Sequence, residues 1–230
     1  MIVLPTSKIK ATRINPRILV IYSAPKVGKT TLLSQLDDCL ILDLEKGSGS
    51  VDAMKVELNS MSELGECIKE IRSKNNPYKY LAIDTITKLE DWCEDLATQD
   101  YRKSPMGKSF EGKSILELPN GAGYFWLRQA FARVKESIES CAENIIYSGH
   151  LRDKMIEKKG KEISAKDLDL TGKIKSITCA NADALGYLYR ENGELMISFA
   201  SNDDVICGAR PEHLRGQMFQ FDWNKIYIKQ

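Results

Sequence analysis

Short apolar runs alternate with segments of helical periodicity along most of this chain, and this alternation restricts the fold more than any other feature of the sequence. The apolar runs predict strands buried on both faces. They lie at residues 18–22, 39–43, 80–84 and 144–148. Apolar residues at helical spacing predict amphipathic helices at residues 28–36, 60–73, 86–96 and 124–141. Strands separated by helices predict an α/β fold with a mainly parallel sheet flanked by helices.

A hairpin signal replaces the alternation toward the C terminus. Asn192-Gly193 is a strong signal for a tight turn between two strands. Apolar runs that predict strands flank this turn or follow it, at residues 185–189, 195–199, 219–223 and 226–228. We therefore expect antiparallel strands in this part of the sheet. The expected organisation is an N-terminal extension (1–16), a core (17–200) and a strand-rich C-terminal extension packed on the core (201–230).

The charge balance and the cysteine spacing exclude several classes of protein. Lys and Arg total 33 and Asp and Glu total 32, so the net charge of +1 excludes a polycationic, histone-like binder and requires any nucleic-acid contact to be local. No apolar run approaches the roughly 18 residues that span a bilayer, and the apolar start of the chain is too short for a secretory signal, so we expect no membrane segment and no export. The six cysteines lie at least 26 residues apart, which favours buried free thiols in a reducing cytoplasm over zinc ligands or disulfides.

A loop with glycine and lysine joins the first predicted strand to the first predicted helix. Its residues, which we expect to surround nucleotide phosphates, are Ser23, Ala24, Pro25, Lys26, Val27, Gly28, Lys29, Thr30 and Thr31. The run Gly28-Lys29-Thr30 ends a Walker A motif in the strand–loop–helix context that this motif requires. Gly28 lets successive N–H groups point at phosphate oxygens, Lys29 reaches the β- and γ-phosphates, and the Thr30 hydroxyl ligates Mg²⁺. Ser23 replaces the first glycine of the motif, which adds a small strain if that position needs a positive φ.

Three further polar side chains are expected beside this loop, at the edge where the parallel strands end. Asp84 ends the third strand, where a Walker B carboxylate holds hydrated Mg²⁺; the alternative is a cap of the next helix. Glu45 follows the second strand and could orient or deprotonate the water that attacks the γ-phosphate; the alternative is a solvated loop acid. His150 ends the fourth strand and could sense the γ-phosphate; the alternative is a surface histidine with no role. With Lys29, these three are the expected catalytic residues.

Together these motifs resemble a RecA-type core. In that family a glutamate follows the second strand, the Walker B aspartate ends the third and a polar switch residue ends the fourth, which match Glu45, Asp84 and His150 here. The likeness is greatest to phage-encoded RecA-like nucleotide-binding proteins, which include single-strand annealing proteins of the Sak type. The phrases that carry it are VIYSAPKVGKTTL, LILDLEKGSGSVD, YLAIDTITKLE, IIYSGHLRDK and DLDLTGKIKSITCANAD.

The resemblance implies a RecA-like P-loop NTPase fold and a Mg²⁺-dependent ATPase, with ATP and Mg²⁺ as cofactors, in the cytoplasm of a phage-infected or prophage-carrying bacterium. It also implies self-association as a ring or filament, because RecA-type ATPases bind nucleotide at subunit interfaces, where a basic residue of the neighbour completes the site. Candidates for that basic residue are Lys173, Lys175 and Arg210. Phage or host replication and recombination proteins are further candidate partners.

Two polar, lysine-rich stretches at 101–121 and 151–175 do not fit the alternation, and we expect them to be long loops. Cations for phosphates and aromatic faces for bases are what a sequence-tolerant single-strand site needs. The stretches lie where RecA-type proteins have their DNA-contacting loops; the alternative is that they are solvated and flexible. The candidate nucleic-acid residues are Arg102, Lys103, Lys108, Phe110, Lys113, Lys158 and Lys159.

Three functions are compatible with the nucleotide-binding motif. The first is an ATP-dependent protein that binds single-stranded DNA in phage-type recombination or strand annealing. The alternative is an ATP-dependent protein regulator or assembly factor with no direct DNA role, which the balanced charge permits. A small-molecule kinase ranks third, because its lid needs several arginines and residues 151–162 contain only one.

Overall fold

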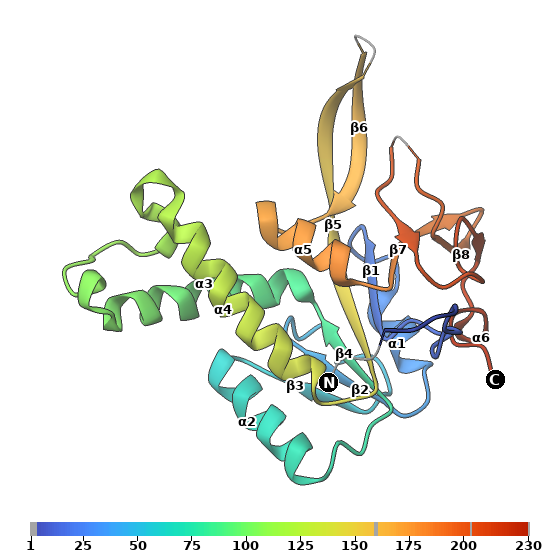
Figure 1. The fold of residues 1–230 in the computed structure, drawn as a ribbon, viewed down its shortest axis with the longest axis horizontal. Coiled ribbons are helices and arrows are strands. Elements are labelled where there is room, and N and C mark those ends of the chain that lie inside the picture. The colour runs from blue at the N-terminus through green and yellow to red at the C-terminus, as the bar shows by residue number, and fades with distance from the viewer. Residues whose placement is uncertain (1–3, 159–160, 203, 230) are drawn as a thin grey trace.

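The structure is a computed structural model that describes residues 4–158, 161–202 and 204–229. Within these residues the strands form one sheet of ten strands. They are β1 (Ile18–Ser23), β2 (Cys39–Asp43), β3 (Lys55–Glu57), β4 (Tyr80–Asp84), β5 (Asn144–Lys158), β6 (Lys161–Leu168), β7 (Ala184–Glu191), β8 (Glu194–Ser198), β9 (Gly208–Ala209) and β10 (Met218–Gln220). The order across the sheet is β10-β8-β7-β1-β5-β4-β2-β3, with β6 paired to β5 and β9 to β7 (Figure 1).

The central strands run parallel, as the alternation predicts. β1 lies between β5 and β7 and is parallel to both, and β4 is parallel to β5 and β2. β8 is antiparallel to β7, and β10 is antiparallel to β8. The turn between β7 and β8 has positive φ at Asn192 (50°) and Gly193 (86°), which is the conformation that an Asn-Gly hairpin turn requires. The mixed α/β fold with antiparallel strands toward the C terminus is confirmed.

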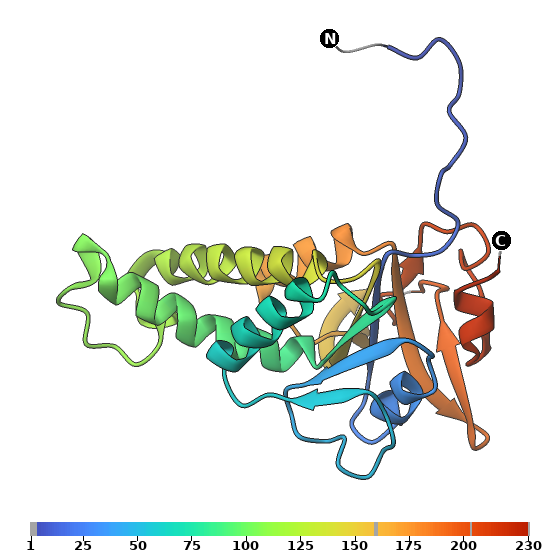
Figure 2. The same cartoon turned by 90° about the horizontal axis from the view of Figure 1, so that it is seen from below.

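Helices cover both faces of the sheet (Figure 2). They are α1 (Lys29–Ser34), α2 (Met61–Ser73), α3 (Ile86–Lys103), α4 (Ala122–Glu139), α5 (Gly172–Asn181) and α6 (Trp223–Ile226). Alternate residues of β1 point to opposite faces: Val20 and Tyr22 lie in the core under α2 to α5, whereas Leu19 and Ile21 lie in the core under α1 and α6. This double cover explains why the central strands read as continuous apolar runs.

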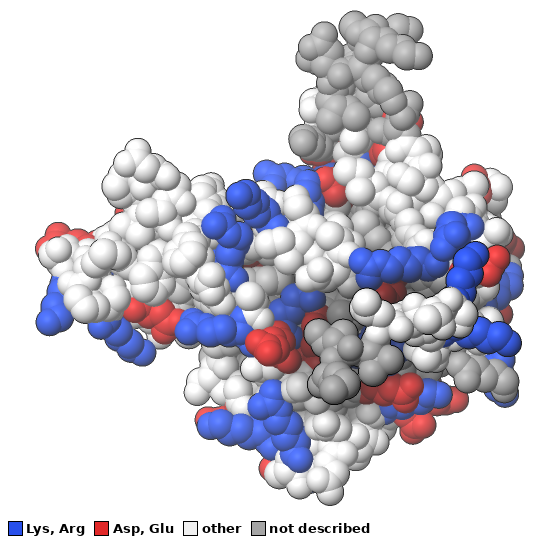
Figure 3. Space-filling view, in the orientation of Figure 1, with Lys and Arg blue, Asp and Glu red and all other residues white. Residues whose placement is uncertain are grey.

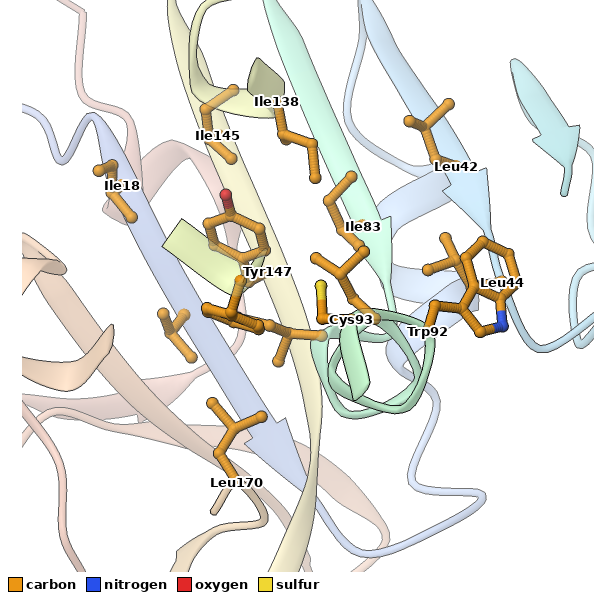
Figure 4. Packing of buried hydrophobic residues seen from close by; sticks show 14 of the residues in the cluster. Ile18, Leu42, Leu44, Ile83, Trp92, Cys93, Ile138, Ile145, Tyr147 and Leu170 are labelled. Carbon is orange, nitrogen blue, oxygen red and sulfur yellow. The ribbon is translucent and has the colours of Figure 1, made fainter. Parts of the chain in front are cut away.

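Figure 4 shows part of the first of these cores. Ile83 of β4, Tyr147 of β5 and Cys93 of α3 lie on the same face of the sheet, and all three are buried. The core therefore fixes α3 directly over the strands whose carboxyl ends carry the predicted site.

The connection between α3 and α4 is an ordered part of a helical arm, not the long loop expected at 101–121. The arm consists of α3, α4 and the 3₁₀ turns Pro105–Gly107, Ile115–Glu117 and Pro119–Gly121, and it extends away from the sheet (Figures 1 and 2). Ile115 is fully buried, and its N–H donates to Thr98 Oγ1 of α3 at 2.9 Å. One apolar anchor among polar residues is too weak a periodic signal to reveal this packing.

The expected loop at 151–175 is mostly a hairpin. β5 continues past residue 148 to Lys158 and pairs with β6 from Leu151↔Leu168 to Lys158↔Lys161, and α5 follows (Figure 1). The hairpin projects beyond the helical layers in Figure 1, and its base packs against the rest of the chain, where Ala165 and Leu168 are buried. Charged residues interrupt both strands beyond residue 150, so the hairpin lacks the continuous apolar run that marked the central strands.

Residues 223–226 form a helix, so the strand predicted over 226–228 is wrong. Asp222 caps this helix by accepting the N–H of Asn224 at 2.8 Å. Trp223 and Ile226, one turn apart, are buried, and Trp223 Nε1 donates to the Leu32 carbonyl at 2.8 Å. The spacing of these two residues fits a single helical turn as well as a strand end, and the contact with α1 selects the helix.

None of the helices in the part of the chain that the structure describes is long and apolar enough to cross a membrane. All six cysteines are free thiols, of which Cys67 and Cys179 are half-buried and the others buried.

Candidate nucleotide-binding site

The predicted phosphate loop connects β1 to α1 and has the backbone that a phosphate cradle needs. Ser23 is the last residue of β1 and has extended strand backbone, so the absence of the usual glycine adds no strain there. The positive φ angles occur later, at Lys26 (63°) and at Gly28 (118°). Gly28 therefore occupies the position where glycine is favoured, immediately before the first residue of α1.

Lys29 is held inside this loop. Its side chain is buried, and Nζ donates to Ser23 Oγ at 3.1 Å. Burial lowers the pKa of Lys29, and the nearby carboxylates of Asp84 and Glu45 oppose that shift. A cation removed from water in this way interacts strongly with a phosphate that enters the loop.

Asp84 and Thr30 form the candidate metal site. Asp84 ends β4 and is 4% exposed; its carboxylate accepts from Thr30 Oγ1 at 2.6 Å and from the Ser148 hydroxyl. Thr85, not Asp84, caps α3, because its side chain accepts the N–H of Lys88, so the helix-cap alternative for Asp84 is wrong. A hydroxyl and a carboxylate that meet at the phosphate loop are oxygen donors of the kind Mg²⁺ prefers, and these residues fit that ion.

Glu45 and His150 meet beside the metal site, although 105 positions separate them in the chain. His150 Nε2 lies 2.8 Å from Glu45 Oε1, and the Thr85 hydroxyl donates to the same oxygen at 2.7 Å. The hydrogen bond from His150 is the largest cause of a lowered pKa of the Glu45 carboxyl, and it outweighs the opposing effect of burial. An ionised carboxylate only accepts hydrogen bonds, so Nε2 is the donor in this pair.

Asp43 positions the segment that carries Glu45, a role that the sequence reasoning missed. Its buried carboxylate accepts the N–H of Glu45 at 3.0 Å and the N–H of Ser48 at 2.8 Å. Burial alone would raise the pKa of Asp43, but these hydrogen bonds outweigh it and lower the pKa. The sequence did contain a signal for this role, because Asp43 ends a predicted strand and a glycine-containing turn follows it.

Ser148 is the second residue that sequence reasoning missed. It lies opposite Asp84 in the register between β4 and β5, and its hydroxyl donates to the Asp84 carboxylate. The predicted strands β4 and β5 both end at these residues, which was the signal available if the two strands are assumed to be neighbours.

The candidate nucleic-acid residues of 101–114 lie at the far end of the arm (Figure 1). Arg102 and Lys103 occupy the last turn of α3, about 25 Å along the helix from Asp84 at 1.5 Å per residue. Arg102 Nη2 donates to the Gly112 carbonyl at 2.7 Å, and Phe110 packs edge-on against Tyr101 with ring centres 5.4 Å apart. The Phe110 ring therefore already packs against another aromatic ring within the arm, which leaves less of its surface to stack on a base.

The remaining lysines of this set are not brought to the nucleotide loop. Lys108 and Lys113 are exposed on the connection between α3 and α4. Lys159 lies outside the described residues, as does the side chain of Lys158.

The three candidates for a basic residue acting on a neighbouring subunit differ in their surroundings. Lys173 is exposed at the start of α5. Lys175 forms an ion pair with the buried carboxylate of Asp167. Arg210 lies 3.3 Å from Asp183 and donates to a backbone carbonyl.

Comparisons with known proteins place this chain in a family. The profile of a protein family described as an AAA domain matches residues 15–210. Among solved structures, one described as a prototypical ATPase from the type III secretion system of pathogenic bacteria is similar, with 15% sequence identity, a TM-score of 0.45, and coverage of 76% of this chain and 53% of that chain. This chain thus spans about half the length of that structure. No curated protein matches the sequence.

Proposed function

Because this chain belongs to the AAA-domain family and has an ATPase-type domain, we propose that it is a Mg²⁺-dependent ATPase that binds single-stranded DNA in recombination or strand annealing of the phage type. The nucleotide part of this proposal depends mainly on one observation. The Glu45 carboxylate is held by two donors, Thr85 and His150, at the same sheet edge as Lys29 and Asp84.

The proposed reaction is attack of a water oxygen on the γ-phosphorus, which breaks the bond to the β,γ-bridging oxygen and yields ADP and phosphate. Glu45 accepts the proton that the water loses. Lys29 and the loop N–H groups hold the β- and γ-phosphates, and Thr30 and Asp84 would hold Mg²⁺, which supplies positive charge opposite the phosphates when bound. His150 fixes the orientation of the Glu45 carboxylate.

Phosphate release from ATP in the presence of Mg²⁺ tests the ATPase directly. We expect the wild-type protein to release phosphate, and the Lys29→Ala variant to lose nearly all of this activity. Equal rates for the two proteins would contradict the proposal, because they would assign the activity to a contaminant.

The support for single-stranded DNA comes from a pocket of about 320 Å³ between the starts of α4 and α5. Arg128 and Lys173 line it, and so does Tyr124, which is 44% exposed. Neither helix start has a side-chain hydrogen bond from its N-cap residue. Two cations, uncapped helix starts and an aromatic face provide contacts to phosphates and bases without reading sequence. Figure 3 shows blue Lys and Arg side chains between the arm and the hairpin on this side of the molecule.

Fluorescence anisotropy with a labelled oligothymidine tests this surface. We expect salt-sensitive binding by the wild-type protein, and removal of both Arg128 and Lys173 should reduce the salt slope by about 1.4, at about 0.7 per phosphate contact to a single strand. Tyr124→Ala should weaken binding at all salt concentrations, and Lys69→Ala, an exposed lysine of α2, is the matched control. Absence of binding at low salt with Mg·ATP would contradict the DNA role. Annealing of complementary oligonucleotides then tests the reaction itself.

A protein partner is the second candidate function, and exposed apolar side chains on the arm support it. Met106 is 72% exposed and Phe125 is 52% exposed. Capture of a defined protein only with a non-hydrolysable ATP analogue, together with absent DNA binding, would favour this function over the first.

We also propose self-association. Residues 4–10 extend away from the rest of the chain (Figure 2), and Leu4 and Ile9 on this segment are 80% and 76% exposed. A mass measurement with and without an ATP analogue tests this, and Ile9→Ser should lower the mass of any assembly that this segment supports. A monomer under all conditions would contradict the proposal.

A further inference from the structure

Arg190 lies beside the phosphate loop, on a strand that the nucleotide motifs did not include. It is near the end of β7, which pairs with β1 on the side opposite to β5. The tight turn at Asn192 and Gly193 follows directly, and Arg190 Nη1 donates to the Gly193 carbonyl at 3.0 Å. The hairpin turn thereby holds one end of the guanidinium group and leaves Nη2 available.

The free end of this guanidinium faces the loop. A Cβ atom added to Gly28 would lie 3.7 Å from Arg190 Nη2. Leu188, two residues earlier on β7, is buried in the core under α1, together with Leu32, and side chains two apart on a strand point to the same face. Arg190 is therefore on the face of the sheet where α1 begins, beside the space that a side chain at position 28 would occupy.

The charge of Arg190 has no carboxylate partner within the described residues. Other arginines there, such as Arg133, Arg152 and Arg210, form ion pairs with aspartates. The side chain of Arg190 is exposed. A planar guanidinium with free N–H donors beside a phosphate loop matches the geometry of phosphate oxygens.

The sheet order indicates which phosphates Arg190 faces. Asp84 ends β4, His150 lies on β5 opposite the last residue of β1, and Glu45 follows β2, so all three lie on the side of β1 away from β7. The γ-phosphate must point toward these groups if Glu45 activates the attacking water. The remainder of the nucleotide then extends toward β7.

We propose that Arg190 binds oxygen atoms of the α- and β-phosphates of a nucleotide held in the loop of the same chain. This inference rests on the proposed ATPase function. It adds a cation supplied within one chain, distinct from any basic residue that a neighbouring subunit contributes.

Calorimetric titration of the full chain with Mg·ATP and with Mg·ADP tests the contact. We expect Arg190→Ala to weaken both nucleotides by a similar factor of about ten, the lower end of the range for a charge-assisted hydrogen bond because the site is exposed. The nucleotide affinities of Arg190→Lys should lie between those of Arg190→Ala and wild type, because lysine keeps the positive charge but lacks the planar guanidinium group with its paired N–H donors. Arg13→Ala, an exposed arginine of the N-terminal segment, should bind as wild type does.

Four results would contradict this inference or the proposed ATPase function on which it rests. Unchanged nucleotide affinities in Arg190→Ala would mean that Arg190 only supports the hairpin turn. Weaker binding of ATP with unchanged binding of ADP would mean that Arg190 contacts the γ-phosphate. Recovery of tight binding when Arg190→Ala is mixed with Lys29→Ala would place the contact between subunits. No binding by the wild-type protein would instead refute the nucleotide site itself. An unchanged melting temperature shows that Arg190→Ala is folded.

Discussion

The replacement Glu45→Gln separates nucleotide binding from hydrolysis. The introduced amide keeps an oxygen that can accept from Thr85 and His150, so the local hydrogen bonds, at 2.7 and 2.8 Å, can persist. The amide cannot take a proton from water. General-base catalysis contributes about 10²- to 10⁴-fold, and we expect the turnover of ATP to fall by this factor. Affinity for ATP should stay the same or improve, because a negative charge near the γ-phosphate is removed.

Single-turnover phosphate release and equilibrium binding of ATP measure the two effects in the same protein. Glu57→Gln is the matched control, since Glu57 is exposed at the end of β3, outside the site. We expect wild-type rates for it. Turnover by Glu45→Gln within about threefold of wild type, far below the contribution of a general base, would refute the assignment. Loss of ATP binding would show instead that Glu45 holds the nucleotide.

The pH dependence of the same reaction provides an independent test of the Glu45–His150 pair. The hydrogen bond from His150 lowers the pKa of Glu45 from its ordinary value of 4.5, so the carboxylate stays ionised to lower pH and activity is lost only as the pH falls below 4.5. The His150→Ala variant loses the hydrogen bond that lowers the pKa of Glu45 most. The pH at which half of the activity is lost on acidification should therefore be higher than in wild type. An unchanged midpoint would mean that another group titrates.

The remaining predictions concern binding and stability. Lys29→Ala should weaken ATP binding by at least about tenfold in calorimetry, because the charge-assisted contact to the β- and γ-phosphates is lost, and unchanged affinity would contradict this. Asp43→Ala should lower the unfolding free energy by about 1–3 kcal/mol in denaturant titration and also slow turnover, because the N–H groups of Glu45 and Ser48 lose their acceptor. Burial raises the pKa of Glu90 to about 6, so its charge costs stability as the pH rises from 4.5 to 6. Glu90→Gln should therefore raise the melting temperature at pH 7.5 and have little effect at pH 4.5, and an equal effect at both would contradict the assignment.

The place of the Gly28-Lys29 loop between a strand and a helix, and of Asp84 at a strand end, could be predicted from the sequence because their signals are local. Gly28 and Lys29 lie in one short run between an apolar strand and a helix, and each strand end can be read without knowing its neighbour. The parallel arrangement then brings Asp84 and His150 to the same edge. The topology also brings Glu45 to this edge, and the structure shows His150 at hydrogen-bond distance from it.

The parts that could not be predicted depend on contacts between distant residues. β5 continues past His150 because β6 supplies its backbone partners, and no continuous apolar run marks β6 or this part of β5. Ile115 anchors the connection of the arm through one buried side chain. The position of Arg190 beside Gly28 could not be predicted for the same reason, since only the pairing of β7 with β1 brings the two residues together.

Two elements leave the sheet edge that carries Glu45 and His150: the projecting hairpin, which the sequence did not predict, and the helical arm, whose two helices it did. β5 continues from His150 directly into the projecting hairpin, and α3 begins at the Thr85 cap that also holds Glu45. The Thr87 hydroxyl accepts the N–H of His150 at 3.1 Å, so the base of the arm and the base of the hairpin are joined behind Glu45. We propose that a ligand that moves either element changes the contact between Glu45 and His150, and that the proposed DNA or protein partner alters the rate of the proposed hydrolysis by this route.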